Sequence, residues 1–323
     1  MSLISLDKLW YTRHPLRWAL LPFACVYQVI TWLRRYYLEH FCQQRVTVPI
    51  IVVGNITVGG VGKTPLVIAL VKQLQARGLR VGIVSRGYGA AIDDFPHEVV
   101  ESESAQLVGD EPLLLAKKAG CPVVIAPDRI KAVRYLLNKY HSQVIVSDDG
   151  LQHYKMGRSI EIAVIDGARG VGNGWCLPAG PLRESTKRLQ QVDFIVVNGG
   201  EWPGGYRMDM RPGDLTQLVT GETIQPAQLS TPVAAVAAIG HPQRFFATLS
   251  GLGVTLNPYP FSDHHSFQAN ELDLPEKMVV MTEKDAVKCQ EFATDKMYFL
   301  PVEAVIEDNF WDCLWTHPSL QFE

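Results

Sequence analysis

The residues with the clearest chemical signature form a glycine-rich segment that ends in Gly62-Lys63-Thr64. An apolar run at 50–53 precedes it, and a helix-like apolar stretch follows it. In such an arrangement, backbone N–H groups converge on phosphate oxygens, the lysine binds the β- and γ-phosphates, and the threonine hydroxyl binds Mg²⁺. The strict motif, G-x-x-x-x-G-K-[ST], has glycine where this chain has Thr57. The sequence therefore predicts a variant phosphate-binding loop, rather than an ordinary glycine-rich turn, formed by Thr57, Val58, Gly59, Gly60, Val61, Gly62, Lys63 and Thr64.

An acidic pair is the second chemical feature. Asp148 and Asp149 directly follow the apolar run 144–147. Ligands of open α/β sheets bind beyond the carboxyl ends of the strands, and P-loop enzymes hold Mg²⁺ with an acidic residue at that place. We predict that Thr64 and Asp148 are metal ligands and that Asp149 is a further ligand or lies just behind them. The alternative is a plain Asp-Gly turn.

Two other polar segments allow more than one interpretation. Asp110, in Gly109-Asp110-Glu111-Pro112, precedes an apolar run and is suited to the N-cap of a helix. His264, in Asp263-His264-His265, is compatible with a surface turn, and too few other ligands lie nearby in the sequence for a zinc site. Spacing alone settles neither case.

The elements that must position these residues alternate in type. Short apolar runs, many of them β-branched, have helix-like stretches between them, and they lie at 50–53, 81–84, 123–126, 144–147, 160–165 and 194–197. This alternation predicts a P-loop-type α/β fold with a doubly wound, mainly parallel sheet. Further runs predict a second, smaller α/β domain, and they lie at 233–239, 254–259, 278–281 and 298–300. We place the nucleotide-binding domain at 45–220 and the smaller domain, which closes the cleft, at 221–323.

The N-terminal segment, residues 1–44, has a different texture. Residues 18–33 carry no charge, have tryptophan near each end, and are flanked by Arg17 and Arg34. This run of 16 residues contains Pro22 and falls short of the roughly 20 apolar residues that span a bilayer. Basic flanks and interfacial aromatic residues predict a helix that lies in or dips into an anionic membrane surface. The alternative is an amphipathic helix buried in the core.

Charge and cysteine content restrict the remaining classes. The chain has 30 basic and 33 acidic residues, a net charge of −3, which disfavours nucleic acid as the main partner. Its six cysteines include no Cys-x-x-Cys pair, so they indicate reduced thiols in a cytoplasmic protein. Nothing in the sequence indicates a protein partner.

Taken together, several segments resemble those of one family. They are 55–65 (Asn-Ile-Thr-Val-Gly-Gly-Val-Gly-Lys-Thr-Pro), 85–89 (Ser-Arg-Gly-Tyr-Gly), 109–112, 148–153 (Asp-Asp-Gly-Leu-Gln-His), 177–184 (Leu-Pro-Ala-Gly-Pro-Leu-Arg-Glu), 263–264 and 282–285 (Thr-Glu-Lys-Asp). In this order they resemble tetraacyldisaccharide 4′-kinase, the kinase of lipid A biosynthesis. That family has a comparable variant loop, a short N-terminal membrane helix and two α/β domains.

The resemblance implies an activity and a set of roles. ATP would bind at 57–64 with Mg²⁺ near Thr64 and Asp148, and the acceptor would be the 4′-hydroxyl of a tetraacyl disaccharide 1-phosphate lipid. Asp110 would take the hydroxyl proton, His264 would be its partner across the interdomain cleft, and Lys63 would offset phosphate charge. The expected substrate-binding residues are Tyr88, Arg129, Gln152, His153, Arg183 and Glu184. The implied location is the cytoplasmic face of the bacterial inner membrane, with peripheral or monotopic attachment.

One rival function comes from a different class. A membrane-associated regulatory ATPase of the switch type would carry lysine at the position of Val58, and this chain does not. The two hypotheses differ in a measurable way, because a kinase needs the lipid acceptor to consume ATP and a switch ATPase does not.

Overall fold

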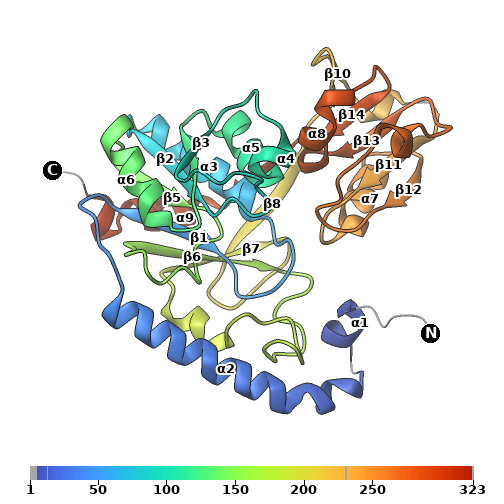
Figure 1. Ribbon diagram of the computed structural model, residues 1–323. Coiled ribbons are helices and arrows are strands. Elements are labelled where there is room, and N and C mark those ends of the chain that lie inside the picture. Colours follow the sequence, from blue (N-terminus) through green and yellow to red (C-terminus); the bar gives the residue numbers. More distant parts are fainter. Residues whose placement is uncertain (1–5, 13, 230, 322–323) are drawn as a thin grey trace.

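The computed structural model describes residues 6–12, 14–229 and 231–321 (Figure 1). Within these ranges the strands form one sheet of nine and one of six strands. The large sheet has the order β15-β8-β7-β6-β1-β5-β2-β4-β3, and the small sheet has the order β10-β9-β14-β13-β11-β12.

The strands of the large sheet are β1 (Ile50–Gly54), β2 (Val81–Ser85), β3 (His97–Val99), β4 (Val123–Ile125), β5 (Val144–Ser147), β6 (Ile160–Asp166), β7 (Phe194–Asn198), β8 (Tyr206–Pro212) and β15 (Val302–Ile306). Those of the small sheet are β9 (Leu215–Gln217), β10 (Thr223–Ile224), β11 (Val233–Ala237), β12 (Leu256–Pro260), β13 (Val279–Thr282) and β14 (Met297–Leu300). The α-helices are α1 (Leu6–Tyr11), α2 (Leu16–Phe41), α3 (Lys63–Ala76), α4 (Ala105–Val108), α5 (Asp110–Ala119), α6 (Arg129–Tyr140), α7 (Pro242–Gly251), α8 (Glu283–Cys289) and α9 (Asp308–Trp315). Short 3₁₀ helices are η1 (Thr186–Gln191), η2 (Pro226–Gln228), η3 (Ala269–Leu272), η4 (Gln290–Phe292) and η5 (Pro318–Leu320).

The large sheet is parallel except at its two edges. Strand β1 lies inside it and pairs in parallel with β5 and β6, whereas the edge strands β3 and β15 are antiparallel to β4 and β8. Every apolar run that the sequence predicted to be a strand is a strand here, within a few residues. The prediction of a doubly wound, mainly parallel α/β fold is confirmed.

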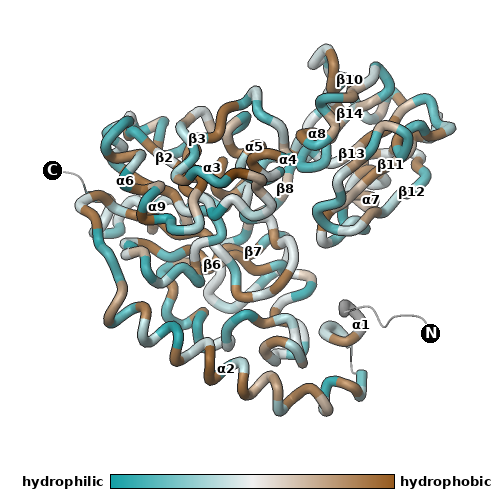
Figure 2. Tube along the Cα trace, in the orientation of Figure 1, coloured by the Kyte–Doolittle hydropathy of each residue, from teal (hydrophilic) through white to brown (hydrophobic). Residues whose placement is uncertain are grey.

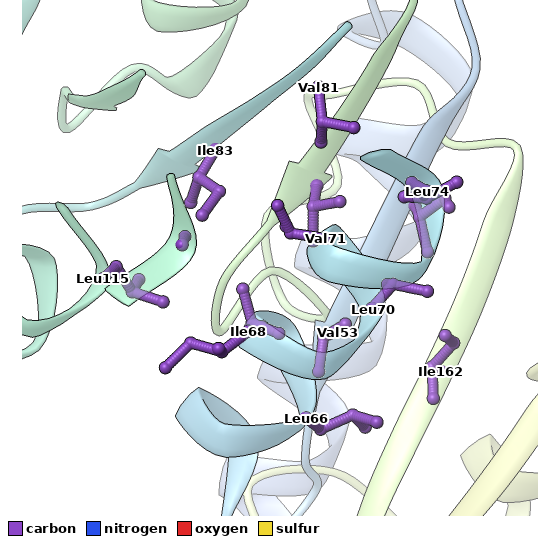
Figure 3. Packing of buried hydrophobic residues seen from close by; sticks show 14 of the residues in the cluster. Val53, Leu66, Ile68, Leu70, Val71, Leu74, Val81, Ile83, Leu115 and Ile162 are labelled. Carbon is purple, nitrogen blue, oxygen red and sulfur yellow. The ribbon is translucent and has the colours of Figure 1, made fainter. Parts of the chain in front are cut away.

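Continuous apolar runs form these strands because helices cover both faces of the sheet. On one face, Leu66 and Leu70 of α3 pack near Val53 of β1 and Ile162 of β6 (Figure 3). On the other face, α6 buries its apolar side against the alternate residues of the same strands, Val52 among them. The phosphate loop between β1 and α3 therefore connects two elements that are buried on the sheet.

The sheets divide the chain differently from the predicted boundaries at 45–220 and 221–323. Strand β9 already belongs to the small sheet, and β15 returns to the large sheet, where it pairs with β8. The strand Val302–Ile306 was not predicted from the sequence, because it is a partly exposed edge strand with no continuous apolar run. We propose residues 215–300 as the smaller domain.

Helix α2 is longer than the uncharged run that predicted it. It extends over Leu16–Phe41 along the outside of the large domain, and of its residues Ala24 and Leu38 are buried (Figure 1). Apolar residues nevertheless continue along it (Figure 2). Its length and composition would suffice to cross a membrane. The alternative of a helix buried in the core is wrong, because water would contact most of this apolar surface.

Candidate active site

The phosphate loop has the backbone geometry that a phosphate site requires. Gly59 and Gly62 have φ angles of 100° and 93°, in the left-handed region that favours glycine. A side chain at Gly62 would also overlap the amide of Asn198. The loop ends at Lys63, where α3 begins, so the N–H groups of the first helical turn face the cleft with the positive end of the helix dipole. Thr57, the first residue of the loop, is buried and accepts a hydrogen bond from Asn55.

Residues from neighbouring strand ends brace this loop. Asn198, at the end of β7, donates its Nδ2–H to the Val61 carbonyl at 2.9 Å. Arg169 donates to the Gly60 carbonyl and pairs with Asp166, at the end of β6. Arg244 of the small domain donates to Asn198 Oδ1 at 2.9 Å. These residues were not predicted from the sequence, although Asp166-Gly167 and Asn198-Gly199 follow predicted strands just as Asp148 does.

Two adjacent aspartates occupy contrasting environments at the end of β5. Asp148 is 1% exposed, and among the described residues neither of its carboxylate oxygens has a hydrogen-bond partner. Burial, reinforced by the charge of Glu111, raises the pKa of Asp148 to about 7. Asp149 has a φ of 46° and forms ion pairs with Lys63 Nζ at 3.3 Å and Arg183 Nη1 at 3.1 Å. Although burial opposes the shift, these cations lower the pKa of Asp149 well below its usual value.

Asp110 and His264 lie together, although they come from different domains. Asp110 Oδ2 is 3.0 Å from His264 Nδ1, and 154 residues separate the two in sequence. Burial opposes ionisation of Asp110, but the hydrogen bond from His264 and the charge of Lys284 prevail and lower its pKa to about 2. The same hydrogen bond raises the pKa of His264. The N-cap interpretation of Asp110 is wrong in detail, because Gly109 occupies the cap and Asp110 is the first residue of α5.

The segment that carries Tyr88 packs directly against this pair. The Tyr88 ring centroid lies 5.6 Å from that of His264. Gly109 has a φ of 91°, and a Cβ at this position would lie 2.8 Å from the Tyr88 carbonyl oxygen. Glycine is therefore required where α5 begins, and it allows Tyr88 and Asp110 to share one wall of the cleft.

The other predicted substrate residues also line this cleft. Arg129 is 3% exposed, and its Nε and Nη1 atoms have no hydrogen-bond partner in the part of the chain that the structure describes. His153 Nε2 is likewise buried, with no hydrogen-bond partner within residues 6–12, 14–229 and 231–321, and burial lowers the pKa of His153 to about 4. Gln152 donates to the Asn55 carbonyl at 3.0 Å, whereas Glu184 accepts hydrogen bonds from the Tyr154 hydroxyl. Arg129 thus brings a buried guanidinium group to the wall of the cleft.

The cleft that these residues surround has a volume of about 1210 Å³. It extends from the phosphate loop past Asp148 to the Asp110–His264 pair, and its wall includes residues of α2 and of the small domain. Within the described part of the chain, no group of three or more His, Cys, Asp or Glu residues could hold a metal ion by itself. The arrangement can bind a polyphosphate at one end and place a base near its terminal phosphate.

Comparison with known proteins decides between the possible classes. Residues 16–318 match the family described as tetraacyldisaccharide-1-P 4′-kinase. The chain belongs to this family. It is 58% identical over 318 residues to the tetraacyldisaccharide 4′-kinase of Legionella pneumophila strain Lens, with 98% of each chain covered. It is 49% identical over 315 residues to that of Aeromonas hydrophila, covering 96% of this chain and 94% of the relative.

A solved structure supports the same assignment. The fold is similar to the crystal structure of LpxK from Aquifex aeolicus in complex with ATP, with a TM-score of 0.77 and 27% sequence identity. The match covers 94% of this chain and 99% of the other. As a member of the tetraacyldisaccharide-1-P 4′-kinase family, the protein is an ATP-dependent kinase of lipid A biosynthesis that phosphorylates the 4′-hydroxyl of its acceptor. The regulatory ATPase alternative is wrong.

Proposed function

We propose that this kinase transfers the γ-phosphate with Asp110 as the base and with the loop 57–64 as the ATP site. The observation that carries the proposal is the hydrogen bond between Asp110 and His264 at the edge of the cleft that contains the phosphate loop. A carboxylate there can accept the proton of the 4′-hydroxyl as the oxygen attacks phosphorus. Lys63, which lies at the start of α3, would offset charge that develops on the phosphates.

A divalent cation would fit between Thr64 and Asp148. The support is the buried Asp148 carboxylate, whose two oxygens have no hydrogen-bond partner among the residues that the structure describes, because an ionised group in that state needs a cation. Mg²⁺ commonly takes one or two carboxylates and completes its coordination with water and substrate phosphates, so a cluster of protein ligands is not required. When bound, it would offset phosphate charge, while Asp149 keeps Lys63 and Arg183 in place.

The acceptor lipid would enter the cleft from a membrane surface along α2. Tyr27, Thr31, Arg34 and Leu38 recur every three or four residues, so they share one helical face, and all of them line the cleft. Large apolar side chains on the adjoining faces remain exposed, including Phe23 and Ile30. We infer that this surface inserts into the cytoplasmic leaflet of the inner membrane, while sugar and phosphate groups reach the polar residues deeper in the cleft.

The proposed reaction is tested with purified full-length protein, γ-labelled ATP, Mg²⁺ and the disaccharide 1-phosphate lipid in mixed micelles. We expect label to appear in a lipid that carries two phosphates, and ATP consumption to stop when the acceptor is omitted. Acceptor-independent loss of the γ-phosphate at the same rate would contradict the proposal.

Asp148→Asn is expected to weaken Mg²⁺-dependent ATP binding and to raise the thermal stability of the metal-free protein. Because burial raises the folded-state pKa to about 7, ionised Asp148 destabilises the metal-free protein increasingly as pH rises from about 4 to 7. The neutral amide should therefore raise the Tm by a few degrees at pH 8 and by less at pH 5, while Mg²⁺-dependent strengthening of ATP binding is lost.

Asp149→Asn serves as the matched control for that experiment. Asp149 is ionised and paired with Lys63 and Arg183, so its replacement should lower the Tm at pH 8. Thermal melts in metal-free buffer and ATP titrations with and without Mg²⁺ provide both readouts. An unchanged Mg²⁺ dependence in Asp148→Asn would exclude this residue as a ligand.

The membrane proposal predicts the effect of charge on the exposed face of α2. The side chains of Phe23, Val26 and Ile30 are 64%, 59% and 58% exposed and lie close together on the helix surface. Changing all three to glutamate should reduce binding to phosphatidylglycerol-containing vesicles by at least about tenfold, because the charges oppose insertion and are repelled by anionic lipid. ATP binding should not change. Vesicle flotation and nucleotide titration measure the two effects.

A control variant places two glutamates on other exposed apolar positions. Val100 and Val219 are 47% and 52% exposed and lie outside α2. Changing both to glutamate should leave flotation with vesicles unchanged. Equal loss in the control and in the α2 variant would mean that general surface charge, and not α2, sets membrane binding.

A further inference from the structure

Helix α8 of the small domain brings a third charged group to the Asp110–His264 pair. Lys284 Nζ lies 2.8 Å from Glu111 Oε1 and 3.7 Å from Asp110 Oδ2. The second of these is the oxygen that also faces His264 Nδ1. The Lys284 side chain is 19% exposed, so both contacts form largely out of water.

The local structure of α8 fixes the direction of Lys284. Thr282 caps the helix, and its hydroxyl donates to Asp285 Oδ2 at 2.7 Å. Asp285 is fully buried, accepts the Ala238 N–H at 2.9 Å and forms an ion pair with Lys288 at 2.7 Å. The first turn of α8 is therefore held to the core of the small domain, and Lys284 extends from it to the first turn of α5 in the large domain.

The surroundings of Asp110 identify what this ammonium group does. From the small domain, Asp110 faces His264 and Lys284, with the charge of Lys288 farther away. On its own helix, its Oδ1 accepts the N–H of Glu111 at 2.9 Å. His264 also faces Asp263, whose Oδ1 lies 3.9 Å from His264 Nε2. Lys284 is thus the nearby cation that stays charged when His264 is neutral.

We propose that Lys284 is a positioning residue for the reaction: its ammonium group, carried by the small domain, keeps the Asp110 carboxylate ionised and joined to His264 when the domains are together. This inference rests on the proposed role of Asp110 as the base. It adds a coupling between the domain interface and the base, because separation of the small domain from α5 would remove both Lys284 and His264 from Asp110.

Loss of the Lys284 charge should move the acidic limb of the pH profile in the same direction whether Asp110 or His264 titrates. Loss of the positive charge removes an interaction that favours the Asp110 carboxylate, so the pKa of Asp110 rises. The same charge repels a proton on His264, so the pKa of His264 rises as well. Lys284→Met should therefore move the acidic limb of the kcat/KM profile upward by about one pH unit or more.

Matched variants separate this role from simple loss of an interdomain contact. Lys118 of α5 pairs with Glu283 of α8 at 2.6 Å, in the same helix–helix interface, but no contact joins it to Asp110 in the described structure. Lys118→Met should leave the acidic limb in place. Lys284→Arg retains the charge and should also leave it in place, whereas Lys284→Gln keeps a donor for Glu111 without charge and should shift it like Lys284→Met.

The test measures pH profiles of kcat/KM for the lipid acceptor in these full-length variants, and the titration of the His264 ring by NMR, assigned with His264→Ala. We expect an upward shift of both the limb and the ring pKa in Lys284→Met and Lys284→Gln alone. The inference is overturned if the acidic limb does not move in these two variants, or if it moves equally in Lys118→Met. If Lys284→Met does not fold, the pH profile of Lys284→Gln is the test. Near-normal turnover of Asp110→Asn would instead overturn the proposed base.

Discussion

Asp110→Asn is expected to lower kcat by about a thousandfold while ATP affinity stays nearly unchanged, because a base acts in the transition state and general base catalysis is typically worth about 10²- to 10⁴-fold. Asparagine keeps the size of the side chain and can still contact His264, so the protein should fold. The measurements are kcat with saturating acceptor and ATP binding by titration.

His264, the hydrogen-bond partner of Asp110, provides a second test of this prediction. Asp110 Oδ2 and His264 Nδ1 are 3.0 Å apart, so the two side chains form one hydrogen-bonded unit. His264→Ala should lower kcat and move the acidic limb of the pH profile upward, since the hydrogen bond that lowers the pKa of Asp110 is lost. The double variant should be little worse than Asp110→Asn alone, as expected for residues that act together. Losses that multiply in the double variant would mean that the two residues act independently.

Lys63→Ala is the second change with a large expected effect, a fall in kcat of at least about a hundredfold. Lys63 is the first residue of α3, at the end of the phosphate loop. Its Nζ atom lies 3.3 Å from both Asn55 Oδ1 and Asp149 Oδ1. Its ammonium group is therefore held in the loop before nucleotide binds, and alanine removes a charge that would offset the developing charge on the phosphates.

A matched control for Lys63→Ala is Lys72→Ala on the same helix. Lys72 forms an exposed ion pair with Glu303 at 3.5 Å, a kind of contact that contributes little to stability. Its replacement should leave kcat unchanged. Circular dichroism and thermal melts establish that both variants fold, and near-normal kcat in folded Lys63→Ala would remove the loop from the catalytic assignment.

The sequence alone determined the nucleotide-binding half of this protein, because its signals are local. A phosphate-binding loop between a strand and a helix needs glycine at particular backbone angles. Gly62-Lys63-Thr64 is therefore a signal that a few consecutive residues are enough to show. Strands buried on both faces leave continuous apolar runs, so the strand that places Asp148 could be predicted from the sequence. The charge-free run at 18–33 likewise predicted that α2 has an apolar surface.

Only the tertiary structure decided which distant residues meet. Asp110 and His264 each had a plausible local interpretation, and their contact depends on how the small domain lies against the large one. Strand β15 returns to the large sheet by an edge pairing that leaves no periodic signal. Asn198, Arg244 and Lys284 act through contacts of high sequence separation, and such contacts depend on the packing of whole elements, which no local pattern of residue types specifies.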